Sequence, residues 1–402
     1  MKLDRYHSTR PNRSHAPGAG QVSEVPSGLW LRPPDRVPGS AVAVDVGAPR
    51  RCISAKSRET GNPMHDRRRF LTNAATGIAG AQLAMMGLAR AQTSEVRVTP
   101  SLGTHTSFAS LKQIDAGLLN VGYADVGPPD GPVVILLHGW PYDIHSYVDV
   151  APLLAARGYR VVVPFLRGYG STRFLSAETF RNGQQSAVAL DVINLMDSLK
   201  IQKAVIGGFD WGTRTADIVA ALWPERCKAL VAVSGYLITN VKAQAEPLPP
   251  KAELGWWYQY YFSTARGEAG YAKYTNDFNK LIWTSVSPKW HFTDAIFERT
   301  AAAFANPDHV AIVIHNYRWR IGLANGEAKY DNLENRLFQG PVITVPTITI
   351  ASDFDGPAKS GAAYRNKYTG KYQHRILDGI GHNVPQEAPK AFAQAIVDVD
   401  QL

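Results

Sequence analysis

The segment from Gly208 to Gly212, Gly-Phe-Asp-Trp-Gly, constrains the fold of this chain more than any other stretch of its sequence. It follows the short apolar run 204–206 and leads into a helical pattern that continues through Trp223. Small residues at both ends allow a tight, strained turn between a strand and a helix, which is the layout of a nucleophile elbow. The pattern predicts that the central side chain, Asp210, stands at the edge of a sheet beside a helix N-terminus.

An aspartate at the centre of this turn narrows the chemistry that the chain can perform. The usual occupant is serine, which serves ester and amide hydrolysis. Acyl transfer to the Asp210 carboxylate would instead give an anhydride. Displacement at a saturated carbon gives an ester that water can then hydrolyse. The elbow therefore favours a reaction that opens a strained ring or expels a halide.

The net charge of the chain is concentrated at its N-terminal end. The formal charge is +9 in 402 residues, but residues 1–91 hold 14 of the 43 Lys and Arg and 6 of the 34 Asp and Glu, a net of +8. The remaining 29 basic and 28 acidic residues give a net of +1. This distribution does not indicate a nucleic-acid-binding surface.

The N-terminal region divides into two parts. Residues 1–63 are rich in Pro, Gly, Ser and Arg and are predicted to be disordered or not translated, with Met64 as the start. Residues 64–91 resemble a twin-arginine export signal, with three consecutive arginines at 67–69, a weakly apolar stretch at 74–88 and an Ala-Arg-Ala cleavage site. We therefore expect an exported protein, periplasmic or secreted, without a stable membrane anchor. Cys227 would be the only cysteine after cleavage and is expected in the core.

Strand and helix patterns alternate along most of the remaining chain. Six short apolar runs are expected as buried strands, at 133–137, 161–163, 204–207, 229–233, 345–350 and 374–377. Helical patterns lie between them, which predicts an α/β fold with a mostly parallel sheet and helices on both faces. The alternation stops between residues 241 and 341, an aromatic-rich helical stretch. We expect core segments at 92–240 and 342–402 and an inserted helical cap at 241–341.

The C-terminal part offers a base and an acid to accompany Asp210. His382 lies between glycines and Asn383 in a loop that follows the last apolar run, and it is the predicted catalytic base. Two carboxylates follow the run 345–350. Asp355 is favoured as the residue that orients the base, because it is the later of the two and the acid normally lies at the tip of this loop. Asp353 is the alternative.

These motifs and their order resemble the epoxide hydrolases of the α/β-hydrolase fold. The resemblance covers nearly all of residues 118–400 and includes His138-Gly139-Trp140-Pro141 directly after the first buried strand. In that family, the amides of the residue after His-Gly and of the residue after the nucleophile form the oxyanion hole. The resemblance therefore implies that Trp140 and Trp211 supply these amides.

The resemblance also implies two cap tyrosines that donate hydrogen bonds to the epoxide oxygen. Tyr258 matches the first, in Tyr-Gln-Tyr-Tyr-Phe, and Tyr317 matches the second, in Asn-Tyr-Arg, although the spacing from Asn to Tyr is one residue shorter than in the family. Tyr260 and Tyr261 are substitutes for Tyr258. A phenol with a pKa of about 10 can donate to the basic leaving alkoxide while remaining neutral at pH 7.

Two other functions remain open from the sequence. Haloalkane dehalogenases share most of these motifs and bind the leaving halide with indole N–H groups, for which Trp211 is one candidate. A non-catalytic protein of the same fold would be expected to have an incomplete triad. The leading interpretation is an epoxide hydrolase for a small apolar epoxide, with water as co-substrate and with no metal and no organic cofactor. The sequence does not indicate an oligomeric state.

Overall fold

The computed structural model describes residues 93–97, 103 and 107–402 of the chain. The extension predicted at 1–63 and the export signal predicted at 64–91 lie outside the described residues, and both stay predictions. Cys227 is buried, as expected, and burial raises the pKa of its thiol to about 12. None of the helices in the described part is both long and apolar enough to cross a membrane.

The described residues contain one sheet of 10 strands. Its strands are β1 (Thr93–Arg97), β2 (Lys112–Ala116), β3 (Leu119–Val126), β4 (Val133–Leu137), β5 (Arg160–Pro164), β6 (Arg173–Phe174), β7 (Ala204–Gly208), β8 (Cys227–Val233), β9 (Thr347–Ser352) and β10 (Tyr372–Asp378). The strand order is β1-β10-β9-β8-β7-β4-β5-β3-β2, and β6 pairs with β3. The seven strands β1, β10, β9, β8, β7, β4 and β5 pair with one another in parallel. By contrast, β3 pairs antiparallel with β5, β2 and β6.

The central strands form from continuous apolar runs because both faces of the sheet are covered. Every residue of β7 is buried, as are four of the five residues of β4. All six predicted runs become strands, but β9 begins two residues later than expected, at Thr347. The parallel, two-sided sheet confirms the predicted fold class.

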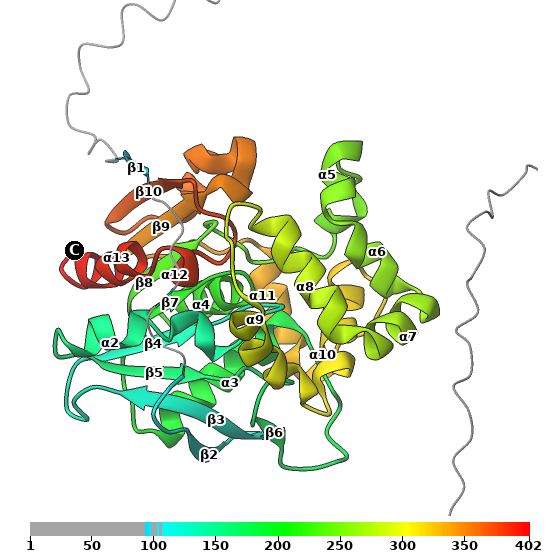
Figure 1. The fold of residues 1–402 in the computed structure, drawn as a ribbon, viewed down its shortest axis with the longest axis horizontal. Helices are drawn as coiled ribbons and strands as arrows, with labels where there is room; N and C mark the ends of the chain where they lie inside the picture. Colours follow the sequence, from blue (N-terminus) through cyan, green and yellow to red (C-terminus); the bar gives the residue numbers. More distant parts are fainter. Residues whose placement is uncertain (1–92, 98–102, 104–106) are drawn as a thin grey trace, which may run out of the picture. The chain divides into compact units, whose positions relative to one another are not determined.

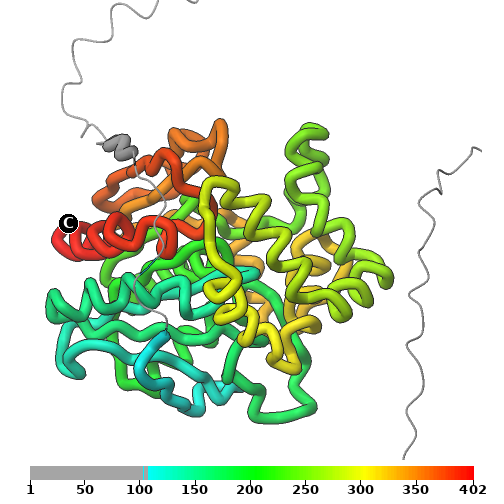
Figure 2. The backbone as a smooth tube through the Cα atoms, in the orientation of Figure 1, coloured from blue at the N-terminus to red at the C-terminus, as the bar shows by residue number. Residues whose placement is uncertain are grey.

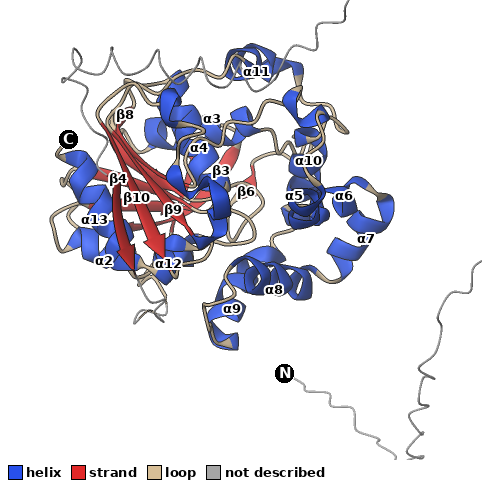
Figure 3. Cartoon of the chain, turned by 90° about the horizontal axis from the view of Figure 1, so that it is seen from above, coloured by secondary structure: helices blue, strands red, loops and turns tan. Residues whose placement is uncertain are grey.

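Helices cover both faces of this sheet (Figure 3). They are α2 (Val150–Ala155), α3 (Gln185–Ser198), α4 (Trp211–Leu222), α12 (Val384–Glu387) and α13 (Pro389–Asp400). On one face α13 packs on α2 and β8, and on the other α4 packs on α3, β7 and β8. The apolar residues Val188 and Val192 of α3 and Ala395 of α13 are buried in these layers.

The chain leaves the sheet after β8 and returns to it at β9, and the segment between them contains helices but no described strand. In Figure 2 this segment is the green-to-orange part of the tube, and in Figure 1 its helices lie to one side of the sheet. They are α5 (Pro250–Gly255), α6 (Trp257–Ser263), α7 (Ala265–Lys273), α8 (Thr275–Val286), α9 (Asp294–Ala301), α10 (His309–Arg320) and α11 (Asp331–Phe338). We refer to this helical segment as the cap.

The parallel topology decides where functional side chains can meet. The carboxyl ends of β4, β7, β9 and β10 lie along one edge of the sheet, because these strands run in the same direction. Asp210, Asp355 and His382 each follow one of these strand ends. Loops at this edge are the usual ligand-binding region of open α/β sheets.

Candidate active site

Asp210 occupies the turn between β7 and α4 in a strained backbone conformation. Its φ is 54° and its ψ is −123°, although it is not a glycine. Such a conformation costs about 1–3 kcal/mol and persists where the surrounding structure enforces it. The turn has the strand–turn–helix layout of a nucleophile elbow and presents the Asp210 carboxylate at the edge of the sheet.

Close backbone approaches explain the glycines around this turn. A Cβ atom on Gly212 would lie 1.8 Å from the Leu137 carbonyl oxygen, so the start of α4 could not pack against the end of β4. A Cβ atom on Gly139 would lie 2.4 Å from Cβ of Asp210. Glycine at 212 therefore allows α4 to lie against the end of β4. Glycine at 139 allows the loop 138–141, which we call the oxyanion loop, to contact Asp210 directly.

The two carboxylate oxygens of Asp210 have different neighbours. Oδ1 accepts a hydrogen bond of 2.8 Å from the backbone N–H of Trp140, and Oδ2 lies 3.5 Å from Nε2 of His382. Burial alone would raise the pKa of Asp210, but the His382 ring and the Arg214 guanidinium hold that pKa below its usual value. Asp210 is therefore ionised at neutral pH, as a nucleophile requires.

Trp140 and Trp211, the residues predicted to supply the amides of the oxyanion hole, follow β4 and Asp210 respectively. The Trp140 amide already donates to Asp210, and Trp211 is the first residue of α4, so its amide has no carbonyl acceptor in a preceding helical turn. The loop before them is fixed by His138, whose Nε2 accepts from the Leu166 amide. Burial lowers the pKa of His138 to about 4, so it is a neutral, structural side chain. Pro141 follows Trp140 through a cis peptide bond.

His382 is buried in the loop between β10 and α12, and this loop is tied to the cap. Its backbone N–H donates to Oγ of Ser287, which follows α8. The Ser287 hydroxyl in turn donates to Glu387, and the carboxylate of Glu387 also accepts from the Gly381 amide at 2.7 Å. The role of Ser287 and Glu387 could not be predicted from the sequence, because it arises from a contact between distant segments.

Asp355 and Asp353 have different environments. Asp355 lines the same cavity as Asp210 and His382, but its Oδ2 accepts from the Ser352 amide at 2.7 Å. Nδ1 of His382 has no protein hydrogen-bond partner among the described residues. Burial raises the pKa of Asp355, and the nearby His382 opposes that increase.

Asp353, the alternative acid, has its carboxylate engaged elsewhere. It accepts from Lys289 at 2.7 Å and from Lys359 at 2.6 Å. Although burial opposes the change, these lysines lower the pKa of Asp353 to about 2. The geometry favours Asp355 over Asp353 as the partner of His382, although the hydrogen bond between them is not formed in this state.

Tyr258 and Tyr317 both lie beside the Asp210 elbow. Each ring centroid is 5.1 Å from that of Trp140, and the two tyrosine rings are 5.4 Å apart and nearly perpendicular. Burial raises the pKa of both phenols, and the negative charge of Asp210 raises each further. Two neutral phenols from α6 and α10 are thus held next to the nucleophile. Tyr260, a substitute candidate, is exposed and bonds to Glu253.

A cavity of about 290 Å³ reaches Asp210 and His382. Apolar walls come from Trp256 and Phe354, whose ring lies 4.2 Å from that of His382. Arg214 and Arg320 also line this cavity, and neither was predicted as a site residue. The sequence spacing could have indicated both, because residues three or four apart lie on the same face of a helix. Arg214 is four residues beyond Asp210, and Arg320 follows Tyr317 by three residues on α10. Within the described part of the chain, no cluster of His, Cys, Asp or Glu could hold a metal ion.

Several known proteins are similar to this chain in sequence or in structure. Residues 132–389 match the family model described as the alpha/beta hydrolase fold. A candidate epoxide hydrolase of known structure from Klebsiella pneumoniae subsp. pneumoniae is 62% identical, with a TM-score of 0.72, over 73% of this chain and 98% of that chain. Epoxide hydrolase A of Mycobacterium tuberculosis is 26% identical over 71% of this chain and 95% of its own length.

Two shorter matches complete the comparison. Epoxide hydrolase B of Mycobacterium tuberculosis is 39% identical, but the match covers 27% of this chain and only 30% of that protein. Haloalkane dehalogenase of Mycobacterium marinum is 32% identical over 33% of this chain and 44% of its own length. The family model covers well over half of the chain and coincides with the elbow, the oxyanion loop and the His382 loop. This chain is a member of the α/β-hydrolase fold family.

Proposed function

We propose that this protein is an epoxide hydrolase, which opens an epoxide to a vicinal diol through a covalent ester of Asp210. The observation that carries the proposal is the pair of buried phenols, Tyr258 and Tyr317, beside an ionised Asp210. Ring opening leaves a strongly basic alkoxide, which needs a proton donor at that position. The relatives named as epoxide hydrolases support the same reaction.

The first step of the proposed reaction forms the ester. Oδ2 of Asp210 attacks an epoxide carbon, because Oδ1 is already held by the Trp140 amide. The bond between that carbon and the ring oxygen breaks, and the oxygen takes its electron pair. Tyr258 and Tyr317 donate hydrogen bonds to this alkoxide, and one of them gives it a proton.

The second step hydrolyses the ester. His382 removes a proton from a water molecule, and the resulting hydroxide attacks the carbonyl carbon of the Asp210 ester. The amides of Trp140 and Trp211 stabilise the oxyanion. Collapse of this intermediate releases the diol and restores Asp210, and the proton on His382 returns to the tyrosine that lost one. Asp355 orients His382 in this scheme once its carboxylate reaches Nδ1, since catalytic hydrogen bonds are often completed only with substrate bound.

One observation favours haloalkane dehalogenation as a second candidate, and other contacts weigh against it. Nε1 of Trp211 is buried without a protein acceptor in the described structure, so it is available to a halide. The indoles of Trp140 and Trp283 are engaged, because they donate to the Tyr271 hydroxyl and to the Pro141 carbonyl. Neither of these two is free to act as a second halide donor.

The two candidate functions are separated by their products. We expect diol from styrene oxide and little bromide from butyl bromide. Tyr317→Phe should lower kcat for styrene oxide about 100-fold or more, the usual contribution of a general acid. It should leave any bromide release nearly unchanged. Bromide release without diol formation would refute epoxide hydrolysis and establish the second candidate.

We also propose that the chain is exported through its twin-arginine-type segment and cut before Gln92. Support for this comes from the sequence alone, in the order of arginines, apolar stretch and Ala-Arg-Ala site. N-terminal sequencing of the protein from the periplasm or medium should begin at Gln92. Retention of full-length protein in the cytoplasm would contradict export.

A further inference from the structure

Two arginine side chains share the cavity with the nucleophile. Arg214 comes from α4 and Arg320 from the last position of α10, and both line the cavity that contains Asp210 and His382. The sequence motifs that indicate epoxide opening do not require either arginine. Two arginines in a small cavity whose lining mixes apolar and polar side chains call for a separate explanation.

Asp210 and Asp355 line the same cavity and offset the positive charge of these arginines without forming an ion pair with either. Arg214 is buried and uses its Nε to donate to the Leu237 carbonyl. Burial and then repulsion from Arg320 lower the pKa of Arg214 to about 10, and Asp210 partly offsets this change. The Arg214 guanidinium is still cationic at neutral pH. Holding two like charges close together in a buried site is unfavourable without an anion.

Neither arginine forms an ion pair with a carboxylate among the described residues, whereas the buried Arg167 does. Arg167 makes a two-pronged pair with Asp191 at 2.6 and 2.7 Å. Arg320 instead lies 5.5 Å over the Tyr317 ring, and its Nε is buried without an acceptor. Among the described residues, no carboxylate accepts from the planar donor fork of Arg320, the group that normally binds one.

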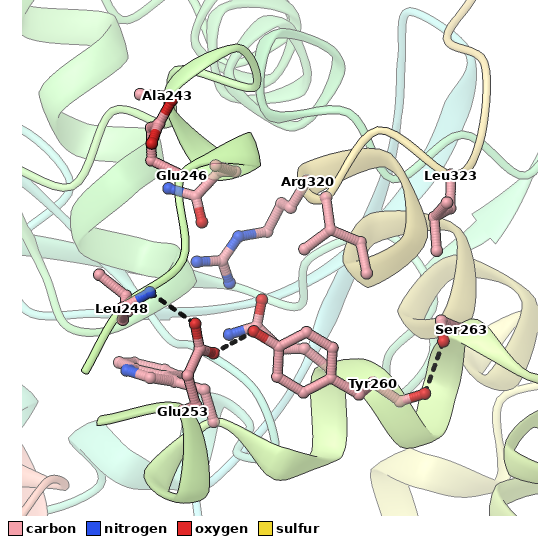
Figure 4. Close-up of a pocket in the computed structure, with 12 residues that line it drawn as sticks. Ala243, Glu246, Leu248, Glu253, Tyr260, Ser263, Arg320 and Leu323 are labelled. Carbon is pink, nitrogen blue, oxygen red and sulfur yellow. Dashed lines mark hydrogen bonds between the residues drawn. The ribbon is translucent and has the colours of Figure 1, made fainter. Parts of the chain in front are cut away.

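A second pocket of about 420 Å³ joins this cavity at Gln244, Trp256 and Arg320, which line both. Figure 4 shows the Arg320 guanidinium pointing into that pocket. The nearby carboxylate of Glu253 accepts instead from the Leu248 amide and the Tyr260 hydroxyl. Arg320 thus stands between the outer pocket and Asp210, where an arriving substrate would meet it.

We propose that Arg320 and Arg214 bind the carboxylate of an anionic substrate, so that the preferred substrate is an epoxide bearing a carboxylate near its ring. The inference rests on the proposed function and refines its substrate class. It replaces the expectation of a wholly apolar epoxide with a substrate that has an apolar part and a charged end. Trp256 and Phe354 provide the apolar contacts, and the two guanidinium groups provide the anion site.

The course of the reaction gives this anion site a further role. Ester formation removes the negative charge of Asp210, which is the carboxylate that offsets the charge of Arg214. A substrate carboxylate remains charged through both steps. It would therefore stay beside the two guanidinium groups in both steps, whereas with a neutral epoxide the negative charge passes from Asp210 to the tyrosinate that the first step forms.

A matched pair of substrates tests this proposal. Phenylglycidate carries a carboxylate beside the epoxide, and phenylglycidamide has an uncharged amide of nearly the same size. We expect the wild-type kcat/KM to be about 10- to 100-fold higher for the carboxylate, the range of charge-assisted hydrogen bonds. Arg320→Met should bring this ratio close to one, mainly through KM for the carboxylate. Arg320→Lys should restore part of it.

Arg336 on α11 provides the control for loss of a positive charge. It is exposed, and Arg336→Met should keep the wild-type ratio. Equal kcat/KM values for the two epoxides in the wild type, with diol formed from both, would overturn the anion site and leave epoxide hydrolysis intact. It would mean that the arginines serve only to keep Asp210 ionised.

A binding measurement separates this inference from the proposed function. Cinnamate and cinnamamide have the same carbon skeleton but no epoxide oxygen, so they report on binding alone. Titration calorimetry should show cinnamate binding about 10- to 100-fold tighter to the wild type, and this preference should disappear in Arg320→Met. Preferential binding of cinnamate without diol from any epoxide would refute the proposed function and keep the anion site. Equal binding of both would refute the anion site.

Discussion

The unequal surroundings of the two Asp210 oxygens assign them different tasks. Oδ1 is held in the oxyanion hole by Trp140, and Oδ2 faces His382 and is free to attack. His382 is needed only for the second step, so its loss should leave ester formation intact. We expect His382→Gln to accumulate a covalent adduct on Asp210, seen by intact-mass spectrometry as a mass increase equal to that of the substrate.

Asp210→Ala is the control variant for the adduct expected in His382→Gln. It removes the nucleophile, so it should give neither adduct nor diol. A fully active Asp210→Ala would refute the covalent scheme. Turnover by His382→Gln at the wild-type rate without an adduct would show that another group activates the water.

The choice between Asp355 and Asp353 can be made by a pair of variants. Asp355→Asn should lower kcat about 100-fold or more, because an amide cannot stabilise the charged His382 ring in the same way. Asp353→Asn should leave kcat within about a factor of three, because its lysine pairs lie near the surface and contribute little. Steady-state kinetics on both variants gives the answer, and the reverse pattern would make Asp353 the triad acid.

At the scale of elements, the cap holds the loop that carries the base. Ser287 follows α8, accepts from the His382 amide and donates to Glu387, whose carboxylate also accepts from the amide of Gly381. Ser287→Ala removes one acceptor and one donor from this buried network. We expect it to lower kcat about 10-fold with little change in KM, because the loop loses its position while the binding residues stay in place.

Ser285 on α8 is the control for this variant. It is exposed and donates only to the Leu281 carbonyl of its own helix. Ser285→Ala should keep the wild-type kcat, KM and melting temperature. If the loss of activity in Ser287→Ala were explained by a smaller fraction of folded protein, with a lower melting temperature, the network would be structural and would not position His382.

At the scale of the whole molecule, the sequence predicted what depends on local pattern. The buried parallel strands and the elbow are visible because apolar runs and glycines mark them. By contrast, β2 (Lys-Gln-Ile-Asp-Ala) has three exposed or partly exposed polar residues and no apolar run, so it was missed. Arg214, Arg320, Ser287 and Glu387 acquire their roles only when cap and core meet, and such contacts leave no local signature in one sequence.

The cationic pair in the cavity has a consequence for the stability of the whole fold. The pKa of Arg214 falls to about 10 in the folded protein, below the usual arginine value, so its charged form is disfavoured by folding. This cost is fully present below about pH 10 and declines as the pH rises through that value. Arg214→Met keeps an apolar stem of similar length without the charge. We expect it to raise Tm at pH 7 by about 2–4 °C for each kcal/mol gained in the free energy of unfolding. The same variant should have lower activity toward phenylglycidate.

Differential scanning calorimetry of the wild type, Arg214→Met and the control Arg336→Met checks this expectation. The control should match the wild type at every pH. The gain of Arg214→Met should be constant from pH 7 to just below pH 10 and should shrink as the pH rises through 10, because the wild-type guanidinium then begins to lose its proton. A Tm well below that of the wild type would mean that the hydrogen bond from Arg214 to the Leu237 carbonyl and the attraction of Asp210 outweigh burial and the repulsion from Arg320. Arg214 would then be a structural residue that happens to line the cavity.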